Sequence, residues 1–160
     1  MTRRSLPASA AQCELGPSCR SDAEYLEAMA SALFRVGFSR QVVARKWPEL
    51  REAFAEFDLD RLAELTQEEV EGLLGDPRVI RNRAKIEAVV ENARTMRDLS
   101  AQAGSFRRYV ETSLAEAGER ETLRDVGQRF RRLGPKTSLI FLRLAGHSMP
   151  ESTAQPEQSA

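Results

Sequence analysis

Apolar residues recur at three-and-four spacing through most of this chain, and this periodicity constrains the fold more than any other feature. Residues at this spacing line one face of an α-helix, as do Leu26, Met29, Ala30, Leu33 and Phe34. No stretch alternates apolar and polar residues for long enough to form a strand. The pattern predicts an all-α protein.

Start and stop signals divide the helical part of the chain. Ser21-Asp22-Ala23-Glu24 and Thr66-Gln67-Glu68-Glu69 both fit a capping box, in which a hydroxyl and a carboxylate satisfy amides at a helix start. We expect helices over 22–36, 39–46, from Pro48 onward, 58–65, 66–74, 105–115, 123–133 and 136–145, and the longest one marked by Val79 to Met96.

The two ends of the chain differ from this middle part. Residues 1–20 and 148–160 are rich in Pro, Ser and Ala, which predicts flexible tails on either side of one domain over 21–147. A chain of 160 residues, 41% hydrophobic and 30% charged, is typical of one soluble domain. It has neither an apolar run of roughly 18 residues nor a secretory signal, so we expect a cytoplasmic protein without membrane contact. Cys13 and Cys19 are too few for a disulfide framework, and we expect free thiols.

The charges balance over the whole chain but not along it. Lys and Arg number 24 and Asp and Glu number 24, with a pI of about 6.6, which excludes a polybasic nucleic-acid binder acting through net charge alone. Residues 48–76 carry ten acidic side chains against two basic ones, a local net charge of −8. Residues 77–97 carry six basic against two acidic (+4), and residues 124–147 carry six against one (+5). An anionic partner is therefore expected at the two basic segments.

Residues 75–85 combine a Gly/Pro turn with a basic helix start. A helix, a tight turn and a second helix opening among Arg and Lys have the layout of a helix-hairpin-helix element, whose amides and helix dipole hold a DNA phosphate without reading sequence. The same pattern also occurs at an ordinary solvated helix start, so the pattern alone leaves both interpretations open. Basic residues early in a helix oppose its macrodipole, which favours an anion at this point.

The segment Asp76 to Arg94, DPRVIRNRAKIEAVVENAR, resembles the corresponding stretch of bacterial 3-methyladenine DNA glycosylases of the constitutive, type I kind. Gly37-Phe38-Ser39 with Lys46-Trp47, Phe54-Ala55-Glu56-Phe57-Asp58, and Leu133-Gly134-Pro135-Lys136-Thr137 agree with that family. The resemblance covers residues 23–146 and implies a helix-hairpin-helix fold that extrudes an alkylated base from the duplex and hydrolyses its N-glycosidic bond. It implies DNA contacts in the hairpin and in the basic stretch 129–136, at Gly75, Arg78, Arg81, Asn82, Arg83, Lys85, Lys136 and Thr137.

The chain departs from the family where the base is recognised. The family's pocket carboxylate falls at Ala32, and its stacking aromatic falls at Arg40, which can stack as a guanidinium plane but repels a cationic purine. The resemblance places the base pocket at Ala32, Phe38, Arg40 and Trp47, although Phe38 and Trp47 also suit the core. Arg78 stands at a family Gly position, so we expect the turn to close differently. No residue is assigned a catalytic role.

Cys13, Cys19, His147 and Glu151 are four potential zinc ligands. The family's N-terminal segment, with its zinc ligands and aromatic residues, is replaced here by a Pro/Ser-rich tail, and Pro150 breaks the helix that would present the last two ligands. A lone His beside a helix-ending Gly more often interacts with the helix dipole. We expect no metal and no cofactor.

The leading hypothesis is a DNA base-excision repair protein, a monomer acting at the nucleoid on duplex DNA with alkylated or distorted bases. The substituted pocket leaves catalysis open, because an alkylated purine is already a good leaving group and extrusion into a shaped pocket supplies much of the effect. One alternative is a non-catalytic DNA-binding paralogue. The other is a protein-interaction module that uses the acidic face of residues 49–76.

Overall fold

The computed structural model describes residues 21–149, and every regular element in that range is helical. This confirms the predicted all-α class. The helices are α2 (Asp22–Arg35), α3 (Arg40–Ala53), the short 3₁₀ turn η1 (Ala55–Phe57), α4 (Leu59–Ala63), α5 (Gln67–Leu74), α6 (Arg83–Ala103), α7 (Phe106–Arg129) and α8 (Pro135–Leu144).

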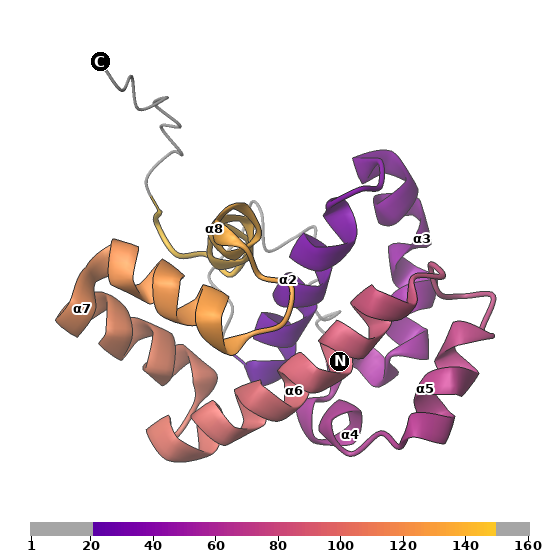
Figure 1. Ribbon diagram of the computed structural model, residues 1–160, viewed down its shortest axis with the longest axis horizontal. Helices are drawn as coiled ribbons and strands as arrows, with labels where there is room; N and C mark the ends of the chain where they lie inside the picture. The colour runs from indigo at the N-terminus through magenta and orange to yellow at the C-terminus, as the bar shows by residue number, and fades with distance from the viewer. Residues whose placement is uncertain (1–20, 150–160) are drawn as a thin grey trace, which may run out of the picture.

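Helix α2 is the centre of the fold (Figure 1). Every residue from Tyr25 to Phe34 is buried, because α3, α6, α7 and α8 all pack against this helix. A helix that is buried all round must be largely apolar, and α2 meets this requirement except at Glu27 and Ser31. Its Tyr25 ring meets Phe106 of α7 and Phe141 of α8 edge to face, which joins three helices in one aromatic cluster.

Two predicted helix starts are observed. The Ser21 hydroxyl accepts from the amide of Glu24 at 3.2 Å and caps α2. Thr66 forms a complete capping box on α5, since its hydroxyl accepts from the amide of Glu69 while the Glu69 carboxylate accepts from the amide of Thr66.

The prediction of separate helices before and after Pro48 is wrong, because α3 runs without a break from Arg40 to Ala53. Proline removes the amide that would bond the carbonyl four residues earlier, here that of Ala44. Ala44 and Pro48 are both exposed, so they share the solvent side of the helix, where water can satisfy that carbonyl. The rule that proline marks a helix start is therefore wrong at Pro48, where the helix continues and only one backbone hydrogen bond is lost.

The two longest helices also correct the predicted boundaries. Helix α6 begins at Arg83 rather than near Val79, because Asn82 has an extended backbone and its side chain accepts from the amide of Lys85 at 3.1 Å. Helix α7 is broken at Gly118, whose φ is 83°, and its two arms fold back on each other, as the prediction of two helices in this region requires (Figure 1). The second arm ends at Arg129, four residues before its predicted end.

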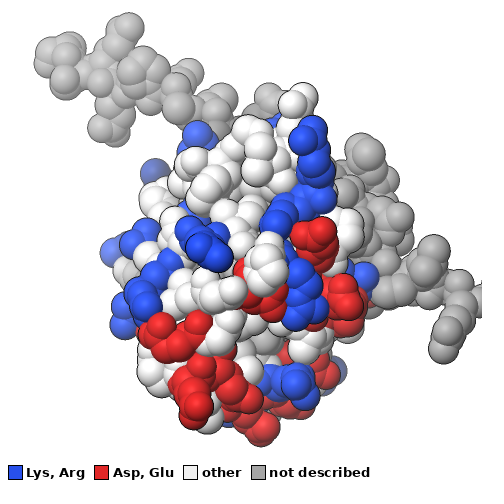
Figure 2. Space-filling view, turned by 90° about the vertical axis from the view of Figure 1, so that its right-hand side faces the viewer, with Lys and Arg blue, Asp and Glu red and all other residues white. Residues whose placement is uncertain are grey.

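The charge segments of the sequence become separate areas of the surface. On the face shown in Figure 2, Asp and Glu gather in the lower part, and Lys and Arg in the upper and left parts. Among residues 21–149, no helix combines the length and the apolar character that crossing a membrane requires.

Candidate functional site

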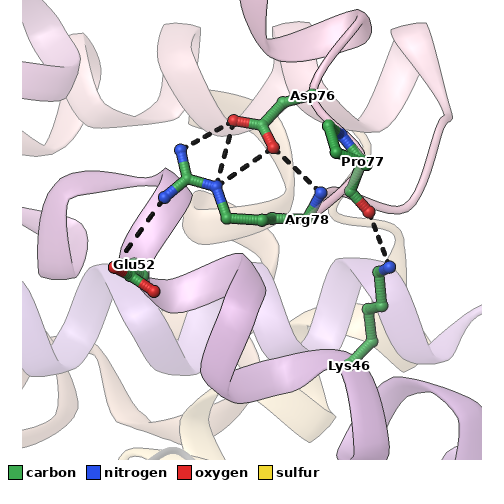
Figure 3. A network of polar contacts seen from close by, with 5 residues as sticks. All are labelled: Lys46, Glu52, Asp76, Pro77 and Arg78. Carbon is green, nitrogen blue, oxygen red and sulfur yellow. Dashed lines mark hydrogen bonds and ion pairs between the residues drawn. The ribbon is translucent and has the colours of Figure 1, made fainter.

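The turn between α5 and α6 is fixed by the side chain of Asp76 (Figure 3). The Asp76 carboxylate accepts from the backbone amide of Arg78 at 2.9 Å and from the Arg78 guanidinium, with Nη2 to Oδ2 at 2.8 Å. These hydrogen bonds lower the pKa of Asp76. Arg78 is not among the residues with positive φ, so a side chain fits at this family glycine position. The turn is thus closed by an aspartate and an arginine that bind each other.

Helix α3 supports this turn from outside. Lys46 Nζ donates to the carbonyl of Pro77 at 2.6 Å, and Arg78 Nη1 lies 4.0 Å from Glu52 (Figure 3). Lys46 and Glu52 both belong to α3, whereas the turn follows α5, so the turn is held by a helix that is not its neighbour in the sequence.

The basic residues expected to contact DNA differ in whether a carboxylate of the protein already binds them. Arg83 binds Glu71 with both terminal nitrogens, at 2.5 and 2.9 Å, and this pair lowers the pKa of Glu71. Arg81 is exposed and pairs with no carboxylate in the described part of the chain. Gly75 ends α5 at an exposed position, and Asn82 uses its side chain as the cap of α6.

Lys85 points into the protein. Its ammonium group donates to the carbonyls of Leu33 (2.8 Å) and Val36, at the end of α2, and lies 4.8 Å from the centre of the Phe38 ring. Only 8% of the residue is exposed, and burial, with a smaller effect of nearby Arg132, lowers the pKa of its ammonium. In this position Lys85 caps α2 rather than meeting an external phosphate.

A pocket of about 1020 Å³ opens where α2 ends, α3 begins and α8 runs past. Its lining combines four basic side chains with apolar ones and one hydroxyl: Arg35, Val36, Gly37, Arg40, Lys136, Thr137, Ile140, Arg143 and Leu144. Three residues expected at DNA or the base, Arg40, Lys136 and Thr137, are brought together here.

The other three residues expected in the base pocket lie outside this lining. Ala32 is fully buried within α2. Trp47 packs against Phe57 with ring centres 5.7 Å apart, and its Nε1 donates to Glu27 at 2.9 Å, so it belongs to the core. Phe38 is partly buried, beneath Lys85.

Two buried polar residues escaped the sequence interpretation. Glu27, 2% exposed, accepts from Trp47 and lies 3.4 Å from Arg51 Nε. Asn92 is fully buried and clamps the backbone of Arg131, whose amide donates to it at 2.7 Å and whose carbonyl accepts from it at 3.1 Å. In each case the sequence offered one signal of a buried polar residue, namely a charged or amide side chain on the apolar face of a predicted helix.

The residues weighed for zinc do not form a described cluster. His147 Nε2 lies 2.8 Å from the Tyr25 hydroxyl, and burial lowers the pKa of its ring. No group of three His, Cys, Asp or Glu side chains between residues 21 and 149 could hold a metal ion. Cys13, Cys19 and Glu151 lie outside the described residues.

Known proteins resemble this chain in both sequence and fold. The family model described as methyladenine glycosylase matches residues 12–139. The chain is 37% identical over 60 residues to DNA-3-methyladenine glycosylase of Haemophilus influenzae, which covers 38% of the chain and 32% of that protein. It is 33% identical over 76 residues to DNA-3-methyladenine glycosylase 1 of Escherichia coli, which covers 48% of the chain and 41% of that protein.

These matched segments therefore span less than half of either relative. Two structures of 3-methyladenine DNA glycosylase I from Staphylococcus aureus superpose on the chain with TM-scores of 0.70 and 0.71. The first is 23% identical to the chain, and the match covers 82% of the chain and 80% of that structure. The second is 20% identical, and the match covers 88% of the chain and 87% of that structure. At that identity they establish a shared fold.

Proposed function

The chain belongs to the methyladenine glycosylase family, and from this membership we propose that it removes an alkylated purine from duplex DNA by hydrolysing the N-glycosidic bond. The family match over most of the chain carries the proposal. The names of the two sequence relatives support it, because each is a DNA-3-methyladenine glycosylase.

In this proposal the α5–α6 turn and the pocket have different tasks. The turn and exposed Arg81 hold the phosphate backbone, which positions the duplex without reading its sequence. The pocket beside α8 receives the extruded base and keeps it away from bulk water. Water then replaces the purine at the sugar carbon. We propose that the chain acts as a monomer on duplex DNA in the cytoplasm or nucleoid.

The test is release of free base from duplexes that each carry one alkylated purine, some cationic and some neutral. With protein in excess over DNA, mass spectrometry should detect the freed base, and cleavage at abasic sites should appear at the same rate. That rate is compared with spontaneous loss in the same buffer. Binding without release of any base would favour the non-catalytic paralogue instead.

A pair of valine variants tests whether the pocket is used. Val36 lines the pocket and is 47% exposed, so Val36→Trp should fill the opening with little effect on folding and slow release at least tenfold. Val42, 52% exposed on α3 and outside the lining, is the matched control, and Val42→Trp should release base at the parent rate. Equal rates for both variants would remove the pocket from the proposal.

A further inference from the structure

A groove separates the end of α3 from α5, and we call it the α3–α5 groove. Two adjoining hollows of about 350 and 510 Å³ form it, and both are lined by Ala55, Arg61, Leu65 and Glu69. The small and apolar residues of the described lining are Ala53, Ala55, Leu62, Leu65, Gly72 and Leu73. Leu65 and Leu73 are partly buried and pack against the core, so the groove offers a partner an apolar floor.

Carboxylates surround this floor. The described lining contains Glu52, Asp58, Glu64, Glu69 and Asp76 against Arg61 and Arg78. Arg78 binds Asp76, and Arg97 lies 3.5 Å from Glu64. Asp58 and Glu69 each use one oxygen to cap a helix, and neither pairs with a Lys or Arg of the described chain. The groove therefore keeps negative charge at its rim.

The negative charge extends beyond the groove, as Figure 2 shows for the lower part of one face. Residues 49–76 carry ten carboxylates. The cations that pair with them are Lys46, Arg51, Arg78, Arg83 and Arg97. Arg61 and Arg94 also lie here, although Arg94 binds backbone carbonyls instead. A net charge of −3 remains after all seven cations are counted, so this surface attracts a cationic partner and repels a phosphate backbone.

Gly72 is an independent observation that points to a partner. It lies inside α5, where glycine stabilises a helix less than alanine does. Its φ is not positive, and a Cβ at this position would meet no described atom within 4 Å apart from its chain neighbours and the backbone of α5. The fold itself therefore does not require a glycine here. Because a missing side chain lets another backbone approach closely, Gly72 marks a place where a second chain can lie against α5.

We propose that the α3–α5 groove binds an extended segment of a partner protein that carries both Lys or Arg and apolar side chains. An extended segment fits better than a helix, because the side chains of a helix would hold its backbone away from Gly72. The apolar side chains would contact Leu65 and Leu73, and the long cationic ones would reach the carboxylates of the rim. This surface is additional to the proposed glycosylase function and does not depend on it.

Fluorescence anisotropy with the full chain tests the proposal. The probes are short labelled peptides that alternate Arg or Lys with Leu, Val or Pro, and a matched set has Glu in place of every Arg and Lys. We expect basic peptides to bind at least tenfold more tightly than their acidic counterparts. Failure of every basic peptide to bind would overturn the proposal.

A variant at Gly72 separates the groove from the general charge of this face. Gly72→Leu leaves the charge unchanged and favours the helix, so the melting temperature should stay equal or rise. The new side chain fills the point of closest approach, and peptide affinity should fall at least tenfold. Ala115→Leu, at an exposed position of α7, is the control and should bind like the parent. Unchanged affinity in Gly72→Leu would show that the peptide binds elsewhere, which would overturn the proposal.

A pair of charge variants tests the rim. Glu64→Gln with Glu69→Gln should lower peptide affinity at least fivefold, and glutamine at 69 can still accept from the amide of Thr66. Glu116→Gln with Glu121→Gln, at exposed positions of α7, removes the same charge outside the groove and should leave affinity unchanged. An equal loss in both pairs would indicate attraction by net charge alone and would overturn the proposal.

Sedimentation velocity distinguishes the other possible occupant. We expect the parent and Gly72→Leu to sediment alike, as monomers. A parent dimer that dissociates in Gly72→Leu would show that a second copy of this chain fills the groove, and it would overturn the assignment to a different partner.

Discussion

Ala55, Glu56 and Phe57 form a left-handed turn between α3 and α4. Their φ values are 51°, 56° and 56°, and none of the three is glycine. The left-handed region costs a residue with a side chain roughly 1 kcal/mol or more, because Cβ approaches the following carbonyl oxygen. Burial of Phe57, which stacks between Trp47 and Phe54, offsets this cost.

Replacing Ala55 with glycine should therefore stabilise the protein. We expect Ala55→Gly to raise the free energy of unfolding by up to about 1 kcal/mol, measured by urea denaturation, since glycine adopts positive φ without strain. Ala101→Gly, at an exposed position within α6, should lower it by a similar amount. Destabilisation by Ala55→Gly would show that the left-handed turn is not a source of strain.

His147 should make stability depend on pH near neutrality. Burial lowers the pKa of its ring, which faces Tyr25 of α2 and Glu111 and Arg107 of α7. The unfolded chain takes up this proton near its ordinary pKa of about 6.5, and the folded chain only at lower pH. Unfolding therefore binds a proton in that window, so the His147 contribution is complete above about pH 6.5 and decreases as the pH falls.

The chain has one histidine, so a single variant isolates this effect. The melting temperature of the parent should fall as the pH is lowered from about 7.5 to 5.5. In His147→Gln the melting temperature should change less over the same pH range. An identical slope in both proteins would assign the pH dependence to other groups.

At the scale of the elements, the connection from α7 to α8 is held at its backbone by Asn92 of α6. Asn92 occupies both hydrogen-bonding groups of the Arg131 backbone, next to Arg132, whose φ is 59°. This connection leads directly into Lys136 and Thr137, which line the pocket.

Loss of that clamp should reduce both stability and pocket order. Asn92→Ala leaves two backbone groups with no protein partner and should cost about 2–3 kcal/mol of unfolding free energy. Asn92→Asp keeps the acceptor for the Arg131 amide but loses the donor, so it should fall between parent and alanine variant if it stays folded. Hydrogen exchange at 130–137 should rise in both. Unchanged protection there would mean that the clamp does not order the connection.

Local rules predicted the elements that local contacts decide. The caps at Ser21 and Thr66 lie within three residues of their partners, and α8 begins at Pro135, one residue before the predicted start at residue 136. The continuity of α3 depends instead on the solvent exposure of Ala44, which is a property of the tertiary fold. For the same reason the spacing of apolar residues could not show that α7 ends at Arg129, because Asn92 of α6 binds the backbone two residues later, at Arg131.

At the scale of the whole molecule, the sequence predicted which basic residues lie near the candidate site but not where their side chains point. The basic residues after Gly75 were identified, but Lys85 turns inward to carbonyls 52 and 49 residues earlier in the chain. Arg83 is neutralised by Glu71 across the turn. The pocket needs side chains from α2, α3 and α8 together, and no spacing within the sequence relates those helices.

These directions give Arg81 and Lys85 different predicted roles. Arg81→Gln should weaken duplex binding roughly two- to tenfold and make the dependence of log K on log salt shallower, with the melting temperature unchanged. Lys85→Gln should lower the melting temperature instead, because the carbonyls of Leu33 and Val36 lose their donor. If Lys85→Gln left the melting temperature unchanged and reduced the salt dependence as Arg81→Gln does, the inward role of Lys85 would be wrong.

The ammonium group of Lys85 links the first turn of α6 to the wall of the pocket. Val36, whose carbonyl it binds, is itself a lining residue, and the same helix start follows the turn proposed to hold the DNA backbone. If the chain acts as proposed, a displacement of α6 on the duplex would therefore reach the rim of the pocket that receives the extruded base. Thermodynamic linkage would make this coupling reciprocal. Binding of a base in the pocket would raise the affinity of the turn for the DNA backbone by the same factor by which backbone binding raises the affinity of the pocket for the base.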